Sequence, residues 1–432
     1  MNELLIAIAL FFVSFACSLL APRAFAVIVI AGFATDLRFA GHDSPVSFSL
    51  QEILVYGFLF AFFVRGYRIY RSSFKTSVSK VVLLYTVLMV ISTVPNLGED
   101  PTHMLSVIRD TVVPFLWFIV FLNFILFVGK DTAVRYFNVF VIIGIISGLL
   151  GFVQHFFHQF VFFNEELNRG YLSVLTEGSI SYAFPATGFF SYFNAYGLFE
   201  QMSLLIALVG VFYSNHRRRS LYLLASAILL MALYFSFSRG SYLSLIVAIL
   251  VGLSVGGRRF KGLGYAVGAS IVGMFFGYIL PFFLNNPKQL ATLLLRFQIW
   301  QTGYVYFVSK SNWLYGMGPG MFVKLVGTNY DVHNEYLMHL FENGIIGFAA
   351  LGMVIAVLLR ESYRLFQKSK PISELASLAL SCYLIFVGYF VQEFVEHSFS
   401  SIIFRLIIFT FAALLVKANQ DFNKWEQANS KT

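Results

Sequence analysis

Three basic side chains stand apart in this 432-residue sequence, because they fall between apolar segments where basic residues are scarce. Arg239 lies in FSRGSYLSL, Arg296 lies in LLLRFQIWQTG, and His333 opens the stretch HNEYLMHLFENGIIGF. A guanidinium group binds phosphate oxygens through several directed hydrogen bonds, and a neutral imidazole can accept a proton. These residue types predict a site that binds a phosphate group and moves a proton.

Each arginine also has a simpler interpretation. A charge near hydrocarbon is costly, so Arg239 could extend to lipid headgroup phosphates instead of binding a phosphate ligand beside the turn at Gly240. Arg296 could be a solvated charge on the flank of an amphipathic helix that has apolar residues at 293, 294, 297 and 300. Both alternatives stay open at this point.

The polar segment DVHNEYLMHLFENGIIGF predicts the start of a helix, because positions 333, 336, 337, 340, 341 and 344 share one helix face. With Asp331 as N-cap, His333 and Asn334 lie in the first turn. Free amide groups there favour a bound anion and a neutral imidazole. Asn334 is therefore a candidate substrate-binding residue, whereas His339 and Glu342 face other directions and are interpreted as structural or interfacial.

Other polar groups do not predict a metal site or a nucleotide site. The sequence has no HExxH motif and no CxxC pair. The glycine-rich GMGPG at 316–320 lacks the Lys-Ser/Thr of a P-loop and predicts a turn. Glu393, Glu396 and His397 are expected to pair with one another or with Arg405.

Composition determines which elements position these groups. Hydrophobic residues make up 58% of the sequence and charged residues 12%, against about 25% charged in soluble proteins. The pattern predicts an all-α polytopic membrane protein with 12 or 13 transmembrane helices. The predicted spans are 4–20, 24–34, 50–64, 81–97, 107–128, 136–153, 192–213, 221–236, 241–255, 263–283, 337–359, 374–392 and 401–416. Pro22 and Arg23 either separate the first two helices or break one.

Charge distribution predicts the topology. The net charge of +9 comes from short basic runs between apolar segments, which predicts an oriented membrane protein and no nucleic-acid partner. The basic loops 65–80, 217–219, 258–261 and 360–370 alternate onto one side, which the positive-inside rule makes cytoplasmic. The long loops 154–191 and 284–336 then face outward, and the second is expected to fold into short helices.

The chain divides into three parts by this pattern. Residues 1–190 hold the first transmembrane helices and the loop 154–191, residues 191–416 hold the remaining helices and the loop 284–336, and residues 417–432 form a cytoplasmic tail. All three candidate basic residues fall in the middle part, on the outward side.

Three segments, taken in chain order, resemble the O-antigen ligase and O-antigen polymerase superfamily of bacterial envelope glycosyltransferases. They are FSRGSYLSL, RFQIWQTG with WLYGMGPGMF, and VHNEYLMHLFENGIIGF. The resemblance covers about residues 190–415 by motif, and the earlier spans only by hydropathy. It implies about twelve helices in the bacterial inner membrane, a large outward loop over an extracytoplasmic site, and a glycan donor on undecaprenyl diphosphate, without a metal or other cofactor. Arg239 and Arg296 match the arginines expected to bind the diphosphate, and His333 matches the histidine implicated in transfer.

Three activities remain open. A polymerase of O-antigen, capsule or exopolysaccharide is favoured, because such enzymes vary widely in sequence and no protein-recognition domain is evident. Its acceptor would be another lipid-linked repeat unit, and its partners would include membrane lipids and a chain-length regulator. A ligase would transfer the glycan to lipid A core or to protein. A flippase without catalysis would need polar residues through the bilayer centre, yet the three basic residues map outward.

Overall fold

The computed structural model describes residues 2–35, 38–39, 48–96, 101–129, 132–157, 185–190, 192–256, 287–310, 312–327, 331–370 and 372–430, with isolated positions between 265 and 276. Helices dominate these residues. The two strands among them, β1 (Arg38–Phe39) and β2 (Phe48–Ser49), form one short antiparallel pair. The predicted all-α fold class is therefore confirmed.

Eight described helices are long and apolar enough to cross a membrane. They are α4 (Ser77–Thr93), α5 (Pro101–Val128), α6 (Thr132–Phe157), α8 (Phe193–Tyr213), α9 (His216–Ser236), α15 (Glu335–Ser369), α16 (Ser373–Gln392) and α17 (Ile402–Asn429). Four further helices are apolar: α1 (Asn2–Leu20), α2 (Pro22–Gly32), α3 (Leu50–Val64) and α10 (Arg239–Val255). They correspond to twelve of the predicted spans. The span predicted at 263–283 lies almost entirely outside the described residues.

The first two predicted spans are separate helices. α1 ends at Leu20 and α2 begins at Pro22, with Ala21 between them at a φ of −138°. Pro22 occupies the first turn of α2, where its missing N–H group costs no helical hydrogen bond. The proline therefore starts a second helix and does not merely kink the first.

The core of the bundle lies around α8 and α17, which are buried along almost their whole apolar lengths. α8 packs on α9 and α16, and α17 packs on α5. Trp117 of α5 is fully buried and donates a hydrogen bond to Thr410 of α17 at 2.8 Å. The indole N–H thus has a partner in a region without water, as a buried polar group requires.

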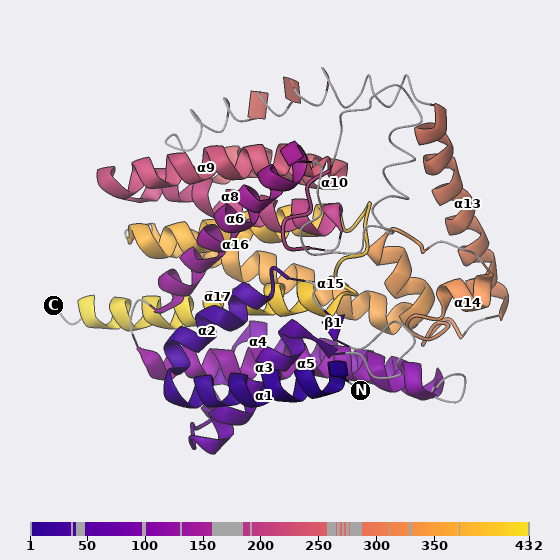
Figure 1. Cartoon of the computed structure of the whole chain (residues 1–432), viewed down its shortest axis with the longest axis horizontal. Coiled ribbons are helices and arrows are strands. Elements are labelled where there is room, and N and C mark those ends of the chain that lie inside the picture. The colour runs from indigo at the N-terminus through magenta and orange to yellow at the C-terminus, as the bar shows by residue number, and fades with distance from the viewer. Residues whose placement is uncertain are drawn as a thin grey trace.

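One long helix, α13 (Pro287–Lys310), runs across an end of the bundle instead of along it (Figure 1). Together with the short α14 (Phe322–Val326) it occupies part of the predicted long loop 284–336. The loop is therefore helical, but the prediction of short helices fits α14 and not α13, which has 24 residues. We call this end of the molecule the α13 end.

α15, which follows this loop, is interrupted near its start. Gly344 has a φ of 64° and a ψ of −165°, a conformation that only glycine adopts readily. The interruption frees backbone groups that pair with the preceding loop. The amide of Gly318 donates to the carbonyl of Glu342 at 2.9 Å, and the amide of Ile345 donates to the carbonyl of Trp313 at 3.1 Å. The loop is thereby joined to α15 through its backbone.

The predicted turn GMGPG is the part of the loop that makes this close contact. Gly316, Gly318 and Gly320 all have positive φ values, and a Cβ atom on Gly316 would lie 2.4 Å from the backbone of Glu342. The Glu342 carboxylate in turn accepts hydrogen bonds from the amides of Gly320 and Phe322, at 2.8 and 3.1 Å. Glu342 is thus structural, as predicted.

The interruption at Gly344 can be tested within α15. Gly344→Ala places a Cβ atom 2.3 Å from the carbonyl oxygen of Leu314 and strains the backbone, which we expect to destabilise the protein by about 1–3 kcal/mol or more. Gly352→Ala, on the exposed side of the same helix with no atom near the new Cβ, should leave stability unchanged. The measurement is the melting temperature in detergent, and equal melting temperatures for the two variants would contradict this account.

Candidate functional site

The predicted basic residues meet at the α13 end around one carboxylate, that of Glu396. Glu396 belongs to residues 393–401, the segment between α16 and α17, which we call the 393–401 loop. Its Oε1 accepts a hydrogen bond from Asn194 Nδ2 at 2.7 Å and lies 4.0 Å from Arg296 Nη2. Its Oε2 lies 3.7 Å from Nδ1 of His333. Residues that are far apart in the sequence therefore share one acidic partner.

Arg239 is the first residue of α10 and joins the same group. It lies within electrostatic range of Arg296 and Glu396. Gly240 provides the close approach: a Cβ atom there would lie 2.9 Å from Cγ2 of Val395 in the 393–401 loop. The Arg239 side chain stays accessible although the surrounding protein partly desolvates it. Two neighbouring guanidinium groups repel each other, so a bound dianion would relieve that repulsion.

α13 holds the two segments that carry the site. Arg296 Nη1 donates to the carbonyl of Val395 at 2.8 Å, and Trp300 Nε1 donates to the carbonyl of Val332 at 2.7 Å. Arg296 and Trp300 are four residues apart and so lie on one helix face. One face of α13 therefore connects the 393–401 loop to the residue that precedes His333.

Only part of the predicted apolar stripe of α13 packs on the protein: Trp300 does, whereas other apolar side chains of the helix are exposed. Leu294 and Phe297 are 55% and 53% exposed, and Tyr304, Val305 and Val308 further along the helix are also exposed. An apolar stripe that faces away from the protein is typical of a helix in a membrane interface. Arg296 is not simply a solvated charge on the flank of this helix, since it binds the 393–401 loop.

His333 precedes α15 and does not lie in its first turn. The prediction that Asp331 caps the helix is wrong, because Asn334 is the N-cap: its Oδ1 accepts from the amide of Leu337 at 3.0 Å, and its Nδ2 donates to the carbonyl of Phe394 at 2.9 Å. His333 has a φ of 50°. Asn334 prevails over Asp331 because it can bind its own helix and the 393–401 loop together.

The start of α15 offers fewer free amides than predicted. The amide of Glu335 donates to the carbonyls of Glu393 and Glu396, at 2.9 and 3.1 Å, and that of Leu337 donates to Asn334. An anion at this site would therefore depend on the arginines more than on the helix N-terminus. Substrate binding by Asn334 stays a prediction.

Glu335 has a structural role that sequence reasoning missed. Its fully buried carboxylate accepts hydrogen bonds from the hydroxyl and the amide of Ser400, at 2.6 and 3.1 Å, and lies 2.8 Å from Nδ1 of His339. His339 Nε2 also lies 3.2 Å from the Tyr85 hydroxyl, so His339 is structural, as predicted. A buried carboxylate is tolerated only with such partners, and here they attach the 393–401 loop to α15.

The acidic residues of the loop pair only partly as predicted. Glu393 Oε2 accepts from the amides of Ser398 and Phe399, at 2.9 and 3.1 Å. Burial raises the pKa of Glu393 well above its usual range, and the nearby Glu335 carboxylate raises it further. Arg405 binds the carbonyl of Ser400 at 2.6 Å and has no acidic partner among the described residues, so the predicted pairing with Arg405 is wrong. The alternative, a pairing of these groups with one another, fits Glu396 and His397, whose ligand atoms lie within 4.8 Å.

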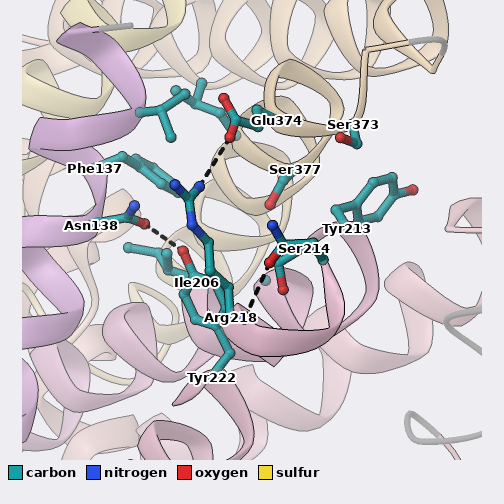
Figure 2. A pocket seen from close by; sticks show the side chains of 14 residues that line it. Phe137, Asn138, Ile206, Tyr213, Ser214, Arg218, Tyr222, Ser373, Glu374 and Ser377 are labelled. Carbon is teal, nitrogen blue, oxygen red and sulfur yellow. Dashed lines mark hydrogen bonds and ion pairs between the residues drawn. The ribbon is translucent and has the colours of Figure 1, made fainter. Parts of the chain in front are cut away.

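A pocket of about 140 Å³ lies at the other end of the bundle, between α6, α8, α9 and α16 (Figure 2). Arg218 points toward Glu374 across it, with 3.1 Å between Nη1 and Oε1, and the Tyr222 hydroxyl donates to Asn138 at 2.9 Å. The pocket contains none of the predicted site residues, and the Arg218 guanidinium already has a carboxylate partner. The candidate functional site is therefore the group at the α13 end.

Comparison with known proteins agrees with this location. Residues 224–352 match a family model described as O-Antigen ligase. The match covers less than a third of the chain, includes Arg239, Arg296 and His333, and ends before Glu396. It confirms the resemblance to the O-antigen ligase and polymerase superfamily over these residues. No curated protein matches the chain.

The attachment of the 393–401 loop by Glu335 can be tested by removing the carboxylate. Glu335→Ala leaves Ser400 and His339 without their acidic partner in a buried site, so we expect a loss of about 3–5 kcal/mol of stability. Glu374→Ala removes an exposed ion-pair partner, which should cost at most about 1 kcal/mol. Thermal unfolding in detergent measures both, and a Glu335→Ala protein as stable as Glu374→Ala would refute the attachment.

Proposed function

We propose that the chain is a membrane glycosyltransferase that polymerises undecaprenyl-diphosphate-linked oligosaccharide repeat units into O-antigen, capsule or exopolysaccharide. One observation carries the proposal: two guanidinium groups and one imidazole gather around Glu396 at one end of the bundle. A transferase of this type needs positive charge for a diphosphate and a proton acceptor for a hydroxyl, within reach of each other.

The α13 end is proposed to face outward from the bacterial inner membrane. The basic run 217–219 begins α9, whose other end leads directly to Arg239. That run therefore lies at the end remote from the site, which the positive-inside rule makes cytoplasmic. The exposed apolar stripe of α13 suits a helix in the outer membrane interface. In that position the site would meet the headgroup of a polyprenyl diphosphate in the outer leaflet.

Arg239 and Arg296 are proposed to bind the diphosphate of the donor. Arg296 lies 4.0 Å from Glu396, which is a weak contact that phosphate oxygens could replace. Breaking the bond between the sugar and the diphosphate leaves negative charge on the departing oxygens, and arginines already in position can stabilise that charge by several kcal/mol. Because the guanidinium groups supply the positive charge, the proposal requires no metal or other cofactor for transfer.

His333 is proposed to accept the proton of the attacking hydroxyl. Its Nδ1 faces Glu396, which leaves Nε2 for the acceptor. A carboxylate that holds one imidazole nitrogen fixes the tautomer in which the other accepts a proton, and the 3.7 Å contact can tighten when substrate binds. The hydroxyl oxygen then bonds to the anomeric carbon, the carbon–oxygen bond to the diphosphate breaks, and the proton moves to Nε2. A direct displacement inverts the anomeric centre.

A ligase is the second candidate, because the matching family model is described as O-Antigen ligase and the match is compatible with either activity. The same donor site would then transfer the glycan to lipid A core or to protein. The two activities share the arginines and His333 and differ only in the acceptor. A flippase without catalysis is less well supported, since Arg239, Arg296 and His333 gather at one end of the bundle and not along its length.

Substitutions at the site test the chemistry. We expect His333→Ala to lower the rate of polymer formation by about 100-fold or more while donor binding survives, and Arg296→Ala to weaken donor binding. Arg364→Ala, an exposed arginine of α15, is the matched control and should be neutral. The assay uses purified protein and a defined lipid-linked repeat unit, with polymer followed on gels. Polymer from His333→Ala at the wild-type rate would rule out the base role.

Glycan length in a deletion strain separates polymerase from ligase. Loss of a polymerase leaves single repeat units on the core, because one unit can still be ligated. Loss of a ligase leaves long chains on undecaprenyl diphosphate. We expect the first pattern, observed on gels of extracted glycolipid, and restoration by wild-type protein but not by the His333→Ala variant. The second pattern would establish the ligase instead.

A further inference from the structure

The structure places a second imidazole, that of His397, beside His333 and Glu396. The rings of His333 and His397 have centroids 5.4 Å apart at an angle of 70°. Each of the three side chains offers one ligand atom, and these atoms all lie within 4.8 Å of one another. From this geometry we propose that His333, Glu396 and His397 form a binding site for a divalent transition metal ion, best suited to Zn²⁺, which switches transfer off.

Unused ring nitrogens support this site. Nδ1 of His333 and Nδ1 of His397 are both buried, and neither has a hydrogen-bond partner among the residues that the structure describes. A buried polar atom without a partner is unfavourable, and here two such nitrogens belong to side chains that lie beside the Glu396 carboxylate. A metal ion would satisfy both nitrogens at once.

The surroundings match those of known metal sites. His397 Nε2 lies 3.6 Å from Asp331 Oδ2, as a carboxylate behind a metal-binding histidine commonly does. Glu396 Oε1 is held by Asn194, which leaves Oε2 on the side of His333. Glu396 also offsets part of the positive field of the two arginines. Small side-chain shifts would bring the three ligand atoms to bonding distance.

The ligand set selects the metal. Two histidines and one carboxylate with an open position are typical of zinc and of other first-row transition metals. Mg²⁺ and Ca²⁺ prefer sites built from oxygen ligands. The site should therefore discriminate strongly between Zn²⁺ and Mg²⁺.

Occupancy by the metal is incompatible with the role proposed for His333, so the regulatory part of this inference depends on the proposed function. A neutral imidazole that binds a metal through Nδ1 carries its only proton on Nε2. That nitrogen can no longer accept the proton of the attacking hydroxyl. The Glu396 carboxylate would also bind the metal ion and would no longer orient the His333 imidazole. Zn²⁺ and transfer therefore exclude each other, and removal of Zn²⁺ by a chelator restores transfer.

Binding is tested directly and without an activity assay. The protein carries Cys17→Ser, because Cys17 is exposed and could bind zinc, and is titrated with Zn²⁺ by calorimetry. We expect one ion per chain, about tenfold or more weaker binding in His397→Gln, and recovery in His397→Cys, which supplies another zinc ligand. X-ray absorption at the zinc edge should report imidazole nitrogen ligands. Unchanged Zn²⁺ affinity in His397→Gln would overturn the site, whatever the protein's activity.

Inhibition is tested with the same variants in the transfer assay. We expect Zn²⁺ to inhibit the wild-type protein, a chelator to reverse the inhibition, and Mg²⁺ at equal concentration to have no effect. His397→Gln should keep its basal rate and require about tenfold more Zn²⁺ for inhibition. If Zn²⁺ binds as described but leaves transfer unaffected, the switch is refuted while the site stands. If neither protein shows transfer, the proposed function fails and the calorimetry still decides the site.

Discussion

The buried carboxylate of Glu335 holds the arrangement at the α13 end together. It binds the hydroxyl and the amide of Ser400 and contacts His339, while its own amide donates to two carbonyls of the 393–401 loop. A carboxylate in a dry interior is stable only when its oxygens have such partners. Few other arrangements of α15 and the 393–401 loop would therefore satisfy the Glu335 carboxylate. Because the start of α15 and the 393–401 loop are fixed to each other here, His333 and Glu396 are placed side by side.

α13 adds a second constraint from outside the bundle. Its Arg296 and Trp300 bind the backbone on either side of the site, and its exposed apolar stripe faces away from the protein. The loop that follows α13 is joined to α15 through the interruption at Gly344. These contacts are mainly to backbone groups, and they fix the segments that carry the polar side chains of the site.

Electrostatics explains why a carboxylate lies in a site proposed to bind a dianion. Arg239 and Arg296 would repel each other strongly in a partly desolvated site if no acidic group were near, and Glu396 offsets part of that repulsion before a donor arrives. The same carboxylate faces Nδ1 of His333. Glu396 therefore links the proposed phosphate-binding groups to the proposed proton acceptor, and it lies outside the segment that matches the family model.

The sequence by itself determined the spans, the glycine turn and the residue types of the site. Hydropathy sums over neighbours along the chain, so the twelve described apolar helices follow from local composition. Arg239, Arg296 and His333 could be selected because basic groups are scarce there. The tertiary structure alone decided that Asn334 caps α15 and that Glu396 is the shared partner. Those outcomes depend on which loops meet at the end of the bundle. The strength of an interaction between charged groups depends on their distance in the folded protein, and the separation of residues along the sequence does not determine that distance.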